Sequence, residues 1–125
     1  MNSASEVKRF SVDAVGMDNA RIFLEKFCED PRPSIVMDEI VSNIVRCSGA
    51  SYFDVGIELN EHGLKLTFTD DGSPFDPTRQ IGEPDVKAKL EDRKIGGLGM
   101  FMVKRMSKSV TYNRVENLNV LVVVM

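Results

Sequence analysis

The sequence is poor in the residues that usually build metal clusters, disulfides and hydrolytic triads. It has one histidine, two cysteines and no tryptophan in 125 residues. A zinc site or a Ser-His-Asp triad would have to be built around His62 alone, and His62 lies in a predicted turn, where we expect it to be exposed. Cys28 and Cys47 are too few for a disulfide framework, so we expect reduced thiols, with Cys47 mostly buried.

The sequence also lacks a long apolar run and an excess of positive charge. No stretch approaches the ~20 apolar residues of a membrane span, and the first ten residues contain no apolar signal segment. The net charge of −3 indicates no general affinity for nucleic acid or for an anionic membrane. We therefore expect a cytoplasmic protein with one compact domain over residues 1–125.

The first part of the chain predicts a strand followed by two helices. Polar and apolar residues alternate over Lys8–Val12, which indicates a strand. Asp18 is the predicted N-cap of a first helix, which we expect to end at the prolines of residues 31–33. Apolar residues at helical spacing predict a second helix, capped by Ser34 and running to about Cys47.

The second part predicts two β-hairpins with a long polar loop and a helix between them. The loop is rich in glycine, proline and charge, and we expect its part from about 78 to 95 to be a lid, with a short helix over Asp85–Arg93. The helix after the loop is predicted over Leu98–Met106. The predicted strands are Tyr52–Leu59, Leu64–Thr69, Val110–Val115 and Val120–Met125.

This order of elements favours a two-layer α/β (α+β) sandwich over a doubly wound parallel sheet. Strands that come in hairpins pair antiparallel, and the helices must then cover one face. We expect a mixed, mainly antiparallel sheet with about three helices on one face. The last strand is apolar on both sides, so we expect it inside the sheet or beneath the lid.

The first candidate site segment is the pair Glu39 and Asn43 in the second helix. Residues four apart lie on one helix face, one turn apart. A carboxylate beside a carboxamide suits a hydroxyl or water activated by Glu39 while the Asn43 oxygen ligates Mg²⁺. The same pair is also common on the solvated edge of an amphipathic helix.

The second segment is Asp70-Asp71-Gly72, directly after a strand. Asp70 at the strand's end is placed to accept a hydrogen bond from an exocyclic amine such as that of adenine. Gly72 permits the close approach of a flat ring. Aspartate and glycine are equally the residues of a plain turn.

The third segment is the glycine-rich run that leads into the last helix. Its backbone N–H groups and the helix N-terminus suit phosphate, although a glycine-rich hinge has the same composition. No Gly-Lys-Ser/Thr follows, so it is not a Walker loop, and it is not a Rossmann fingerprint. The residues are Gly96, Gly97, Leu98, Gly99 and Met100.

In this order, the three segments resemble the GHKL (Bergerat-fold) ATPases, and within them the anti-sigma factor serine/threonine kinases. Glu39 and Asn43 match the N box, and Asp70 with Gly72 matches the first glycine box. Gly96–Met106 (GGLGMFMVKRM) is very close to the second glycine box of that branch. The similarity spans nearly the whole chain and includes Pro74-Phe75-Asp76-Pro77, Val110-Thr111-Tyr112 and Asn119-Val120-Leu121.

The resemblance implies ATP and Mg²⁺ as cofactors and a role for each segment. Asn43 would bind Mg²⁺, Glu39 would be the catalytic base, and Asp70 would recognise adenine with Gly72 packed nearby. The second glycine box would contact the phosphates, and the lid would close over them. Arg93 or Lys94 would neutralise phosphate charge.

The resemblance also implies protein partners: a sigma factor, and an anti-anti-sigma antagonist whose serine is phosphorylated. A homodimer through the edge strand or the first helix would follow the family's habit. A non-catalytic ATP-sensing module of the same fold is the alternative, whereas a fragment of a sensor histidine kinase would need a dimerisation helix pair. The one departure is Cys47-Ser48-Gly49, where the branch often has a histidine and a small-plus-aromatic pair.

Overall fold

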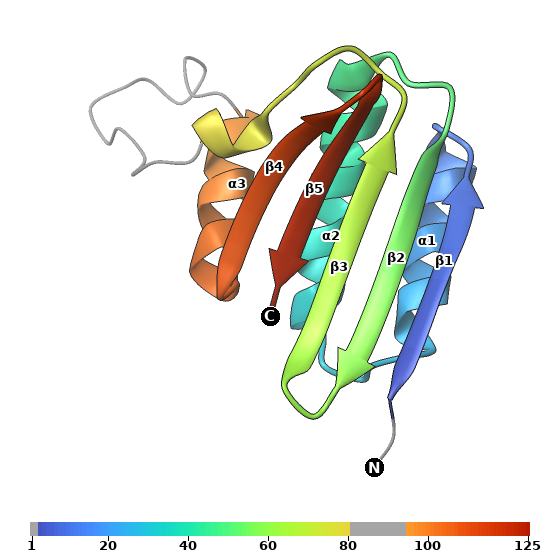
Figure 1. Cartoon of the computed structure of the whole chain (residues 1–125), viewed down its shortest axis with the longest axis vertical. Coiled ribbons are helices and arrows are strands. Elements are labelled where there is room, and N and C mark those ends of the chain that lie inside the picture. Colours follow the sequence, from blue (N-terminus) through green and yellow to red (C-terminus); the bar gives the residue numbers. More distant parts are fainter. Residues whose placement is uncertain (1–2, 81–94) are drawn as a thin grey trace.

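The computed structural model describes residues 3–80 and 95–125. In these residues, five strands form one sheet in the order β1-β2-β3-β5-β4, and three α-helices cover one of its faces (Figure 1). The predicted two-layer α/β fold is confirmed, and every pair of neighbouring strands is antiparallel. The strands are β1 (Ala4–Phe10), β2 (Phe53–Asn60), β3 (Gly63–Asp70), β4 (Ser109–Val115) and β5 (Leu118–Val124). The helices are α1 (Ala14–Glu25), α2 (Arg32–Asn43) and α3 (Ile95–Met106), with the π-helix η1 (Ile44–Ser48) and the 3₁₀-helix η2 (Pro77–Gln80).

The core lies between the sheet and the helices. Alternate residues of each inner strand point toward the helices, because side chains change face at every step along a strand. α2 buries one stripe at helical spacing against this face of the sheet. The largest fully buried side chains are Phe53, Phe68, Leu24, Met37, Ile57 and Leu66.

The first strand and the first helix begin earlier than the sequence predicts. β1 starts at Ala4 and ends at Phe10, not over Lys8–Val12, because its pairing with β2 runs along that whole length. Asp13 caps α1 in place of Asp18, and its Oδ1 accepts a hydrogen bond from the backbone N–H of residue 16 at 2.8 Å. α1 then ends at Glu25, before the prolines are reached.

The prolines belong to the start of α2 and not to the end of α1. α2 begins at Arg32 rather than Ser34, with a proline inside its first turn, where a missing N–H loses no helical hydrogen bond. The helix continues through η1 to Ser48, close to the predicted end at Cys47. Because η1 turns Ile44 and Ser48 inward, Cys47 is exposed, and the prediction of a mostly buried thiol is wrong.

The two hairpins are present, with one change of length. The β2–β3 turn carries His62, whose side chain is 86% exposed, as predicted. The β4–β5 turn consists of only Glu116 and Asn117, so Leu118 and Asn119 belong to β5. β5 lies between β3 and β4, which confirms that the last strand is inside the sheet.

The last helix starts three residues before the predicted Leu98. α3 begins at Ile95, so the glycine-rich run lies within its first turns and not in a loop before it. Glycine weakens a helix but does not forbid one, and the packing of Met100 and Val103 into the core supports it. Of the predicted lid, residues 78–80 belong to η2. Residues 81–94, with the predicted Asp85–Arg93 helix, lie outside the described residues.

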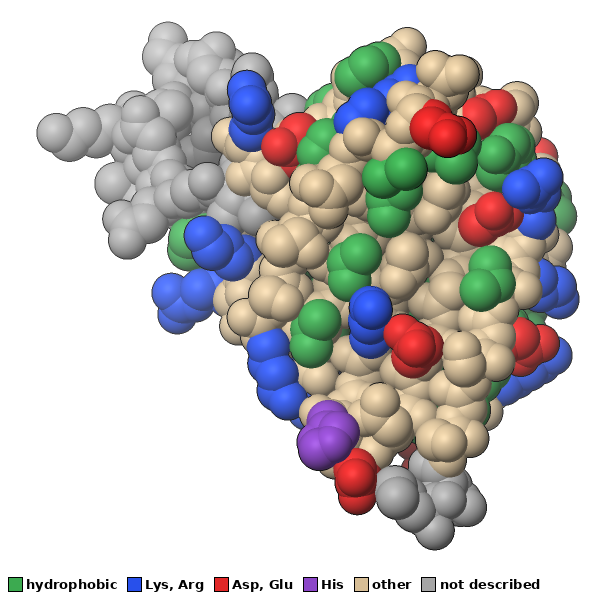
Figure 2. All heavy atoms as spheres, in the orientation of Figure 1, with side chains coloured by type: hydrophobic (Ala, Val, Ile, Leu, Met, Phe, Trp, Pro, Cys, Tyr) green, Lys and Arg blue, Asp and Glu red, His purple; other side chains and the backbone are tan. Residues whose placement is uncertain are grey.

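The other face of the sheet is open to solvent in Figure 2. Two cross-strand ion pairs lie on it, Arg9 with Asp54 at 2.8 Å and Lys65 with Glu58 at 3.5 Å. Val7 of the edge strand β1 is 69% exposed there. No helix in the part of the chain that the structure describes is long and apolar enough to cross a membrane.

Candidate functional site

α2 carries Glu39 and Asn43 on one face, one turn apart, as the sequence predicts. Within residues 3–80 and 95–125, Glu39 Oε1 and Asn43 Nδ2 are buried and have no hydrogen-bond partner. Buried polar atoms are nearly always paired, so two unpaired atoms on one helix face indicate a place for a ligand or water. Asn43 Oδ1, in contrast, accepts a hydrogen bond from Nη2 of Arg46 at 2.7 Å.

Gly99 of α3 lies directly against the carboxylate of Glu39. A methyl group on Gly99 would overlap Cδ and Oε1 of Glu39 and would lie 2.5 Å from its Oε2. Glycine therefore leaves the room that Glu39 occupies. The contact brings the N-terminal turn of α3, with Gly96 and Gly97, to the N-box helix. The first N–H groups of an α-helix have no partner within the helix and attract anions.

Met100 has a different place from the other residues of the glycine-rich run. Its side chain is fully buried in the core, so it is a packing residue. Any contact of Met100 with a ligand would therefore have to come from its backbone. The side chain of Leu98 lies outside what the structure describes.

Asp70 ends β3 and is 4% exposed, with its side chain toward the helices. Its Oδ1 accepts hydrogen bonds from the backbone N–H of Gly72 at 2.9 Å and from Nδ2 of Asn119 at 3.0 Å. Both contacts use the same oxygen. Oδ2 of Asp70 makes no hydrogen bond to the described residues, so it is free to accept one from a ligand donor.

Asn119 of β5 holds this side of the site together. It is 5% exposed and lies opposite Asp70 in the β3–β5 register. Its Nδ2 donates to Asp70 and to the carbonyl of Ser73 at 2.8 Å. Its Oδ1 accepts from the Tyr112 hydroxyl, from Nη1 of Arg114 at 3.1 Å and from the N–H of residue 75 at 3.3 Å. Asn119 therefore connects β3, β4, β5 and the loop after Asp70.

Gly72 packs against the end of η1. A methyl group on Gly72 would overlap the carbonyl oxygen of Ser48 and would lie 2.7 Å from Cβ of Ser48. The N–H of Ser73 donates to that same carbonyl at 2.8 Å. The close approach that the sequence predicts at Gly72 thus exists between two parts of the protein backbone, and it joins the first glycine box to the N-box helix.

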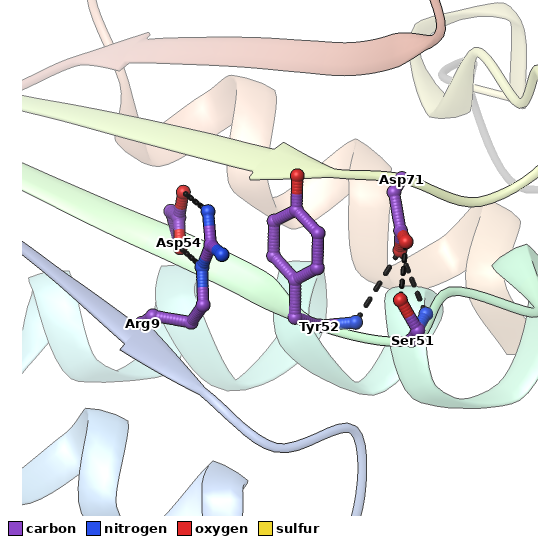
Figure 3. A network of polar contacts seen from close by, with 5 residues as sticks. All are labelled: Arg9, Ser51, Tyr52, Asp54 and Asp71. Atoms are coloured by element: carbon purple, nitrogen blue, oxygen red, sulfur yellow. Dashed lines mark hydrogen bonds and ion pairs between the residues drawn. The ribbon is translucent and has the colours of Figure 1, made fainter.

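Asp71 anchors the same loop from the other side. It accepts hydrogen bonds from the backbone N–H and hydroxyl of Ser51, and from the N–H of Tyr52 at 3.3 Å (Figure 3). These hydrogen bonds lower the pKa of the Asp71 carboxyl, the Ser51 hydroxyl being the main cause. Beside them, the Arg9 guanidinium stacks 3.7 Å from the Tyr52 ring centre and pairs with Asp54. Adjacent aspartates therefore have separate tasks, since Asp70 faces the interior and Asp71 fixes the loop.

A small cavity lies between the part of the site on α2 and the part at the end of β3. Asn43 and Asp70 both line it, together with Ser48, Phe75, Tyr112 and Asn119. Its volume is about 20 Å³, which is room for about one water molecule. A purine would enter only after side chains such as Phe75 move aside.

The model of the histidine kinase-like ATPase domain matches residues 12–125. The chain belongs to this family. A comparison with curated proteins finds no match. Two close contacts join the site segments of this histidine kinase-like ATPase domain: Gly99 with Glu39, and Gly72 with Ser48 at the end of η1.

The donor atoms of this ATPase domain fit Mg²⁺ bound together with ATP. The amide oxygen of Asn43 and the carboxylate of Glu39 are hard oxygen ligands on one helix face. No group of three or more His, Cys, Asp or Glu side chains in the described part of the chain is placed to hold a metal. Mg²⁺ commonly takes one or two protein ligands and completes its shell with phosphate oxygens and water.

The electrostatics of Glu39 suit a proton acceptor. Burial raises the pKa of Glu39 above its ordinary value of 4.5, and the positive charge of Arg46 partly opposes that rise. A carboxylate with a raised pKa is a stronger base than an exposed one, and pKa shifts of this kind concentrate at functional sites.

Two residues of the site escaped the sequence analysis. Asn119 was identified only as part of a strand motif, and Arg46 was not singled out. The spacing of Arg46, three positions after Asn43 on a predicted helix, is the signal that would have placed the two side chains on one face. No local pattern pairs Asn119 with Asp70, because that contact depends on the register between β3 and β5.

Proposed function

We propose that this protein binds Mg-ATP and acts as an anti-sigma regulatory factor in the cytoplasm, phosphorylating a serine of an anti-anti-sigma protein. The observation that carries the proposal is the cluster of Glu39, Asn43 and Gly99. It combines two unpaired buried polar atoms with a glycine that leaves room for the carboxylate. Membership of the histidine kinase-like ATPase family supports ATP as the ligand of this cluster. In the proposal, residues 1–125 form a single ATPase domain with a lid at about 78–95.

The adenine side and the phosphate side of the nucleotide would be held by different segments. Oδ2 of Asp70 would accept the exocyclic amine, since Oδ1 is occupied by Gly72 and Asn119. The N-terminal turn of α3 would bind phosphate oxygens through backbone N–H groups, where the helix dipole favours negative charge.

Asn43 would hold Mg²⁺, which when bound neutralises charge on the phosphates. Glu39 would accept the proton of the serine hydroxyl as it attacks the γ-phosphorus, and the bond from that phosphorus to the β–γ bridging oxygen would break. The serine becomes a phosphoserine and ADP leaves with the bridging oxygen.

The branch and its partners rest on sequence motifs. GGLGMFMVKRM over residues 96–106, followed by the strand Val110-Thr111-Tyr112, is the pattern that resembles the anti-sigma kinases. A sigma factor and an anti-anti-sigma antagonist are the partners that this pattern implies. The edge strand β1 and helix α1 lie at the opposite end of the sheet from α3 in Figure 1, and a homodimer or a partner would use them.

A non-catalytic ATP sensor of the same fold is the second candidate. Cys47 is the observation that favours it, because it is exposed beside the N box where the branch often has histidine. In this alternative, Mg-ATP would change protein binding without any transfer of phosphate.

The deciding experiment follows γ-labelled ATP onto an anti-anti-sigma protein from the same genome. We expect phosphoserine on that protein with the wild type and at least a 100-fold lower rate with Glu39→Gln. Equal yields from both would refute the role of Glu39, and ATP-dependent binding without phosphate transfer would establish the sensor instead. Calorimetry with ATP, with and without Mg²⁺, on the wild type and on Asn43→Ala tests the metal role separately.

A further inference from the structure

Arg46 is hydrogen-bonded to Oδ1 of Asn43, the oxygen that would ligate the metal. Its Nη2 donates to Oδ1 of Asn43 at 2.7 Å, and Asn43 is 3% exposed. The π-helix η1 sets this geometry, because Arg46 follows Asn43 by three positions in a continuous helical segment. The guanidinium of Arg46 thus occupies the oxygen atom that would ligate Mg²⁺.

Arg46 differs from four other arginines of the described residues in how its charge is balanced. Arg9, Arg21, Arg32 and Arg79 each have an aspartate within ion-pair distance. Arg46 has no carboxylate within that distance among the residues that the structure describes. Its charge nevertheless reaches the site, since it opposes the burial-driven rise in the pKa of Glu39. A guanidinium without a carboxylate partner is suited to phosphate oxygens, which it binds in a bidentate manner.

Binding of a guanidinium and of Mg²⁺ to Oδ1 of Asn43 at the same time is electrostatically unfavourable. Mg²⁺ ligates oxygen at about 2.0–2.1 Å, which would place its charge close to that of Arg46. Like charges at such distances repel strongly where the surroundings are partly buried. Metal binding at Asn43 therefore requires Arg46 to leave, and a nearby anion that accepts the guanidinium favours that move.

We propose that Arg46 is a positioning residue that holds Asn43 in the nucleotide-free protein and is drawn away by the polyphosphate, so that the metal binds only together with nucleotide. The inference rests on the proposed binding of Mg-ATP. It has two consequences. ATP without metal keeps part of its affinity through the charge of Arg46, and metal without ATP is excluded from Asn43.

The first test compares ATP affinity in EDTA and in excess Mg²⁺, by calorimetry, for the wild type and Arg46→Gln. Arg46→Gln removes the charge, so we expect ATP affinity in EDTA to fall about tenfold. Affinity in Mg²⁺ should change much less, because the metal replaces the lost charge. The gain in affinity on adding Mg²⁺ should therefore be about tenfold larger in the variant. A purely structural Arg46 would lower both affinities by the same factor, which would overturn the inference.

Arg32→Gln is the matched control, because Arg32 pairs with Asp30 on the surface, and within the described residues its side chain bonds only to Asp30. Its two affinities should equal those of the wild type. Arg46→Lys serves as a second variant that keeps the charge, and its gain with Mg²⁺ should lie closer to the wild-type value. Since Arg46 and Arg32 are both exposed, all three variants are expected to fold, which circular dichroism checks.

The second test uses Mn²⁺ alone as the probe, with binding followed by electron paramagnetic resonance. We expect Arg46→Gln to bind Mn²⁺ at least tenfold more tightly than the wild type in the absence of nucleotide, and Asn43→Ala in the same background to abolish that gain. Equal Mn²⁺ binding by wild type and Arg46→Gln would overturn the inference while leaving ATP binding intact. A wild type that binds no ATP in either buffer would instead refute the proposed function, and the inference with it.

Discussion

The carboxylate of Glu39 occupies the space that a side chain on Gly99 would fill. This contact joins the middle of α2 to the first turns of α3. It is the point where the N box meets the second glycine box, and it explains why glycine lies inside a helix that would otherwise prefer alanine.

Gly99→Ala is expected to separate stability from function. Alanine is the better helix former by about 1 kcal/mol, so the free energy of unfolding should not fall. The added methyl group displaces only the end of the Glu39 side chain, which is flexible. A displacement of about 1 Å commonly costs about 100-fold in rate, so phosphate transfer should drop by that order. Urea unfolding and the transfer assay measure the two effects.

Gly56→Ala is the matched control for this glycine. A methyl group there meets its nearest neighbour, a Val7 methyl carbon, at 3.5 Å, which is ordinary contact. It lies on the open face of the sheet, so activity should stay at the wild-type level. A Gly99→Ala variant with full activity would mean that Glu39 does not need its present position.

Gly72→Ala should damage the fold itself. The obstacle there is the backbone carbonyl of Ser48, which cannot rotate away as a side chain does. Forcing an extra methyl group into a packed site costs about 1–3 kcal/mol, and we expect the upper part of that range because backbone must move. The midpoint of urea unfolding reports the loss. Unchanged stability would show that the loop after Asp70 is free to shift.

Asn119→Ala should weaken both stability and nucleotide binding. It removes five hydrogen bonds at once and leaves Asp70 without its cross-strand donor. Each buried polar group that loses its partner costs about 1–3 kcal/mol, so a loss of about 2–4 kcal/mol in unfolding free energy is expected. Tyr112→Phe removes one of these bonds and should cost about 1 kcal/mol or less. Equal losses for both variants would contradict the central place given to Asn119.

Glu39→Gln should raise stability at neutral pH while abolishing transfer. Burial raises the pKa of Glu39 in the folded protein above 4.5, so the folded state holds its proton to a higher pH than the unfolded state. Stability therefore falls as the pH rises from 4.5 through the folded pKa, and Glu39 opposes folding above it. Removing the charge should raise Tm by roughly 2–5 °C at pH 7, a modest value because the group is partly exposed.

The same variant gives a pH signature. The Tm difference between Glu39→Gln and the wild type should shrink on acidification and vanish below the ordinary pKa of 4.5, where both side chains are neutral. Scanning calorimetry between pH 4 and pH 8 follows it. A difference that is constant over this range would mean that the effect does not come from the ionisation of Glu39.

Local patterns predicted the parts of the fold that local forces determine. The i, i+4 spacing of Glu39 and Asn43 places them on one helix face whatever the tertiary structure. The alternation of the hairpin strands likewise predicts an antiparallel sheet. Asp13 and Asp18 are both good N-cap residues, so residue type alone does not choose between them, and the structure has Asp13 as the cap.

Side-chain conformations and the exact course of the helices were beyond sequence reasoning. The bond from Arg46 to Asn43 depends on a side-chain conformation at the surface, where several are open to arginine. The exposure of Cys47 depends on the wider turn of the π-helix η1, and a regular helical pattern does not predict that turn. The start of α3 at Ile95 depends on packing that supports glycines in a helix.

The bond between Asn119 and Asp70 also has a kinetic meaning. The two residues are 49 positions apart, and they meet only after β3 and β5 have paired in register. Closing such a loop costs entropy before any contact repays it, so non-local pairings form slowly compared with helices. The side of the site around Asp70 is therefore among the last features to assemble during folding. A partly folded chain can carry its full helical content and still be unable to take up ATP.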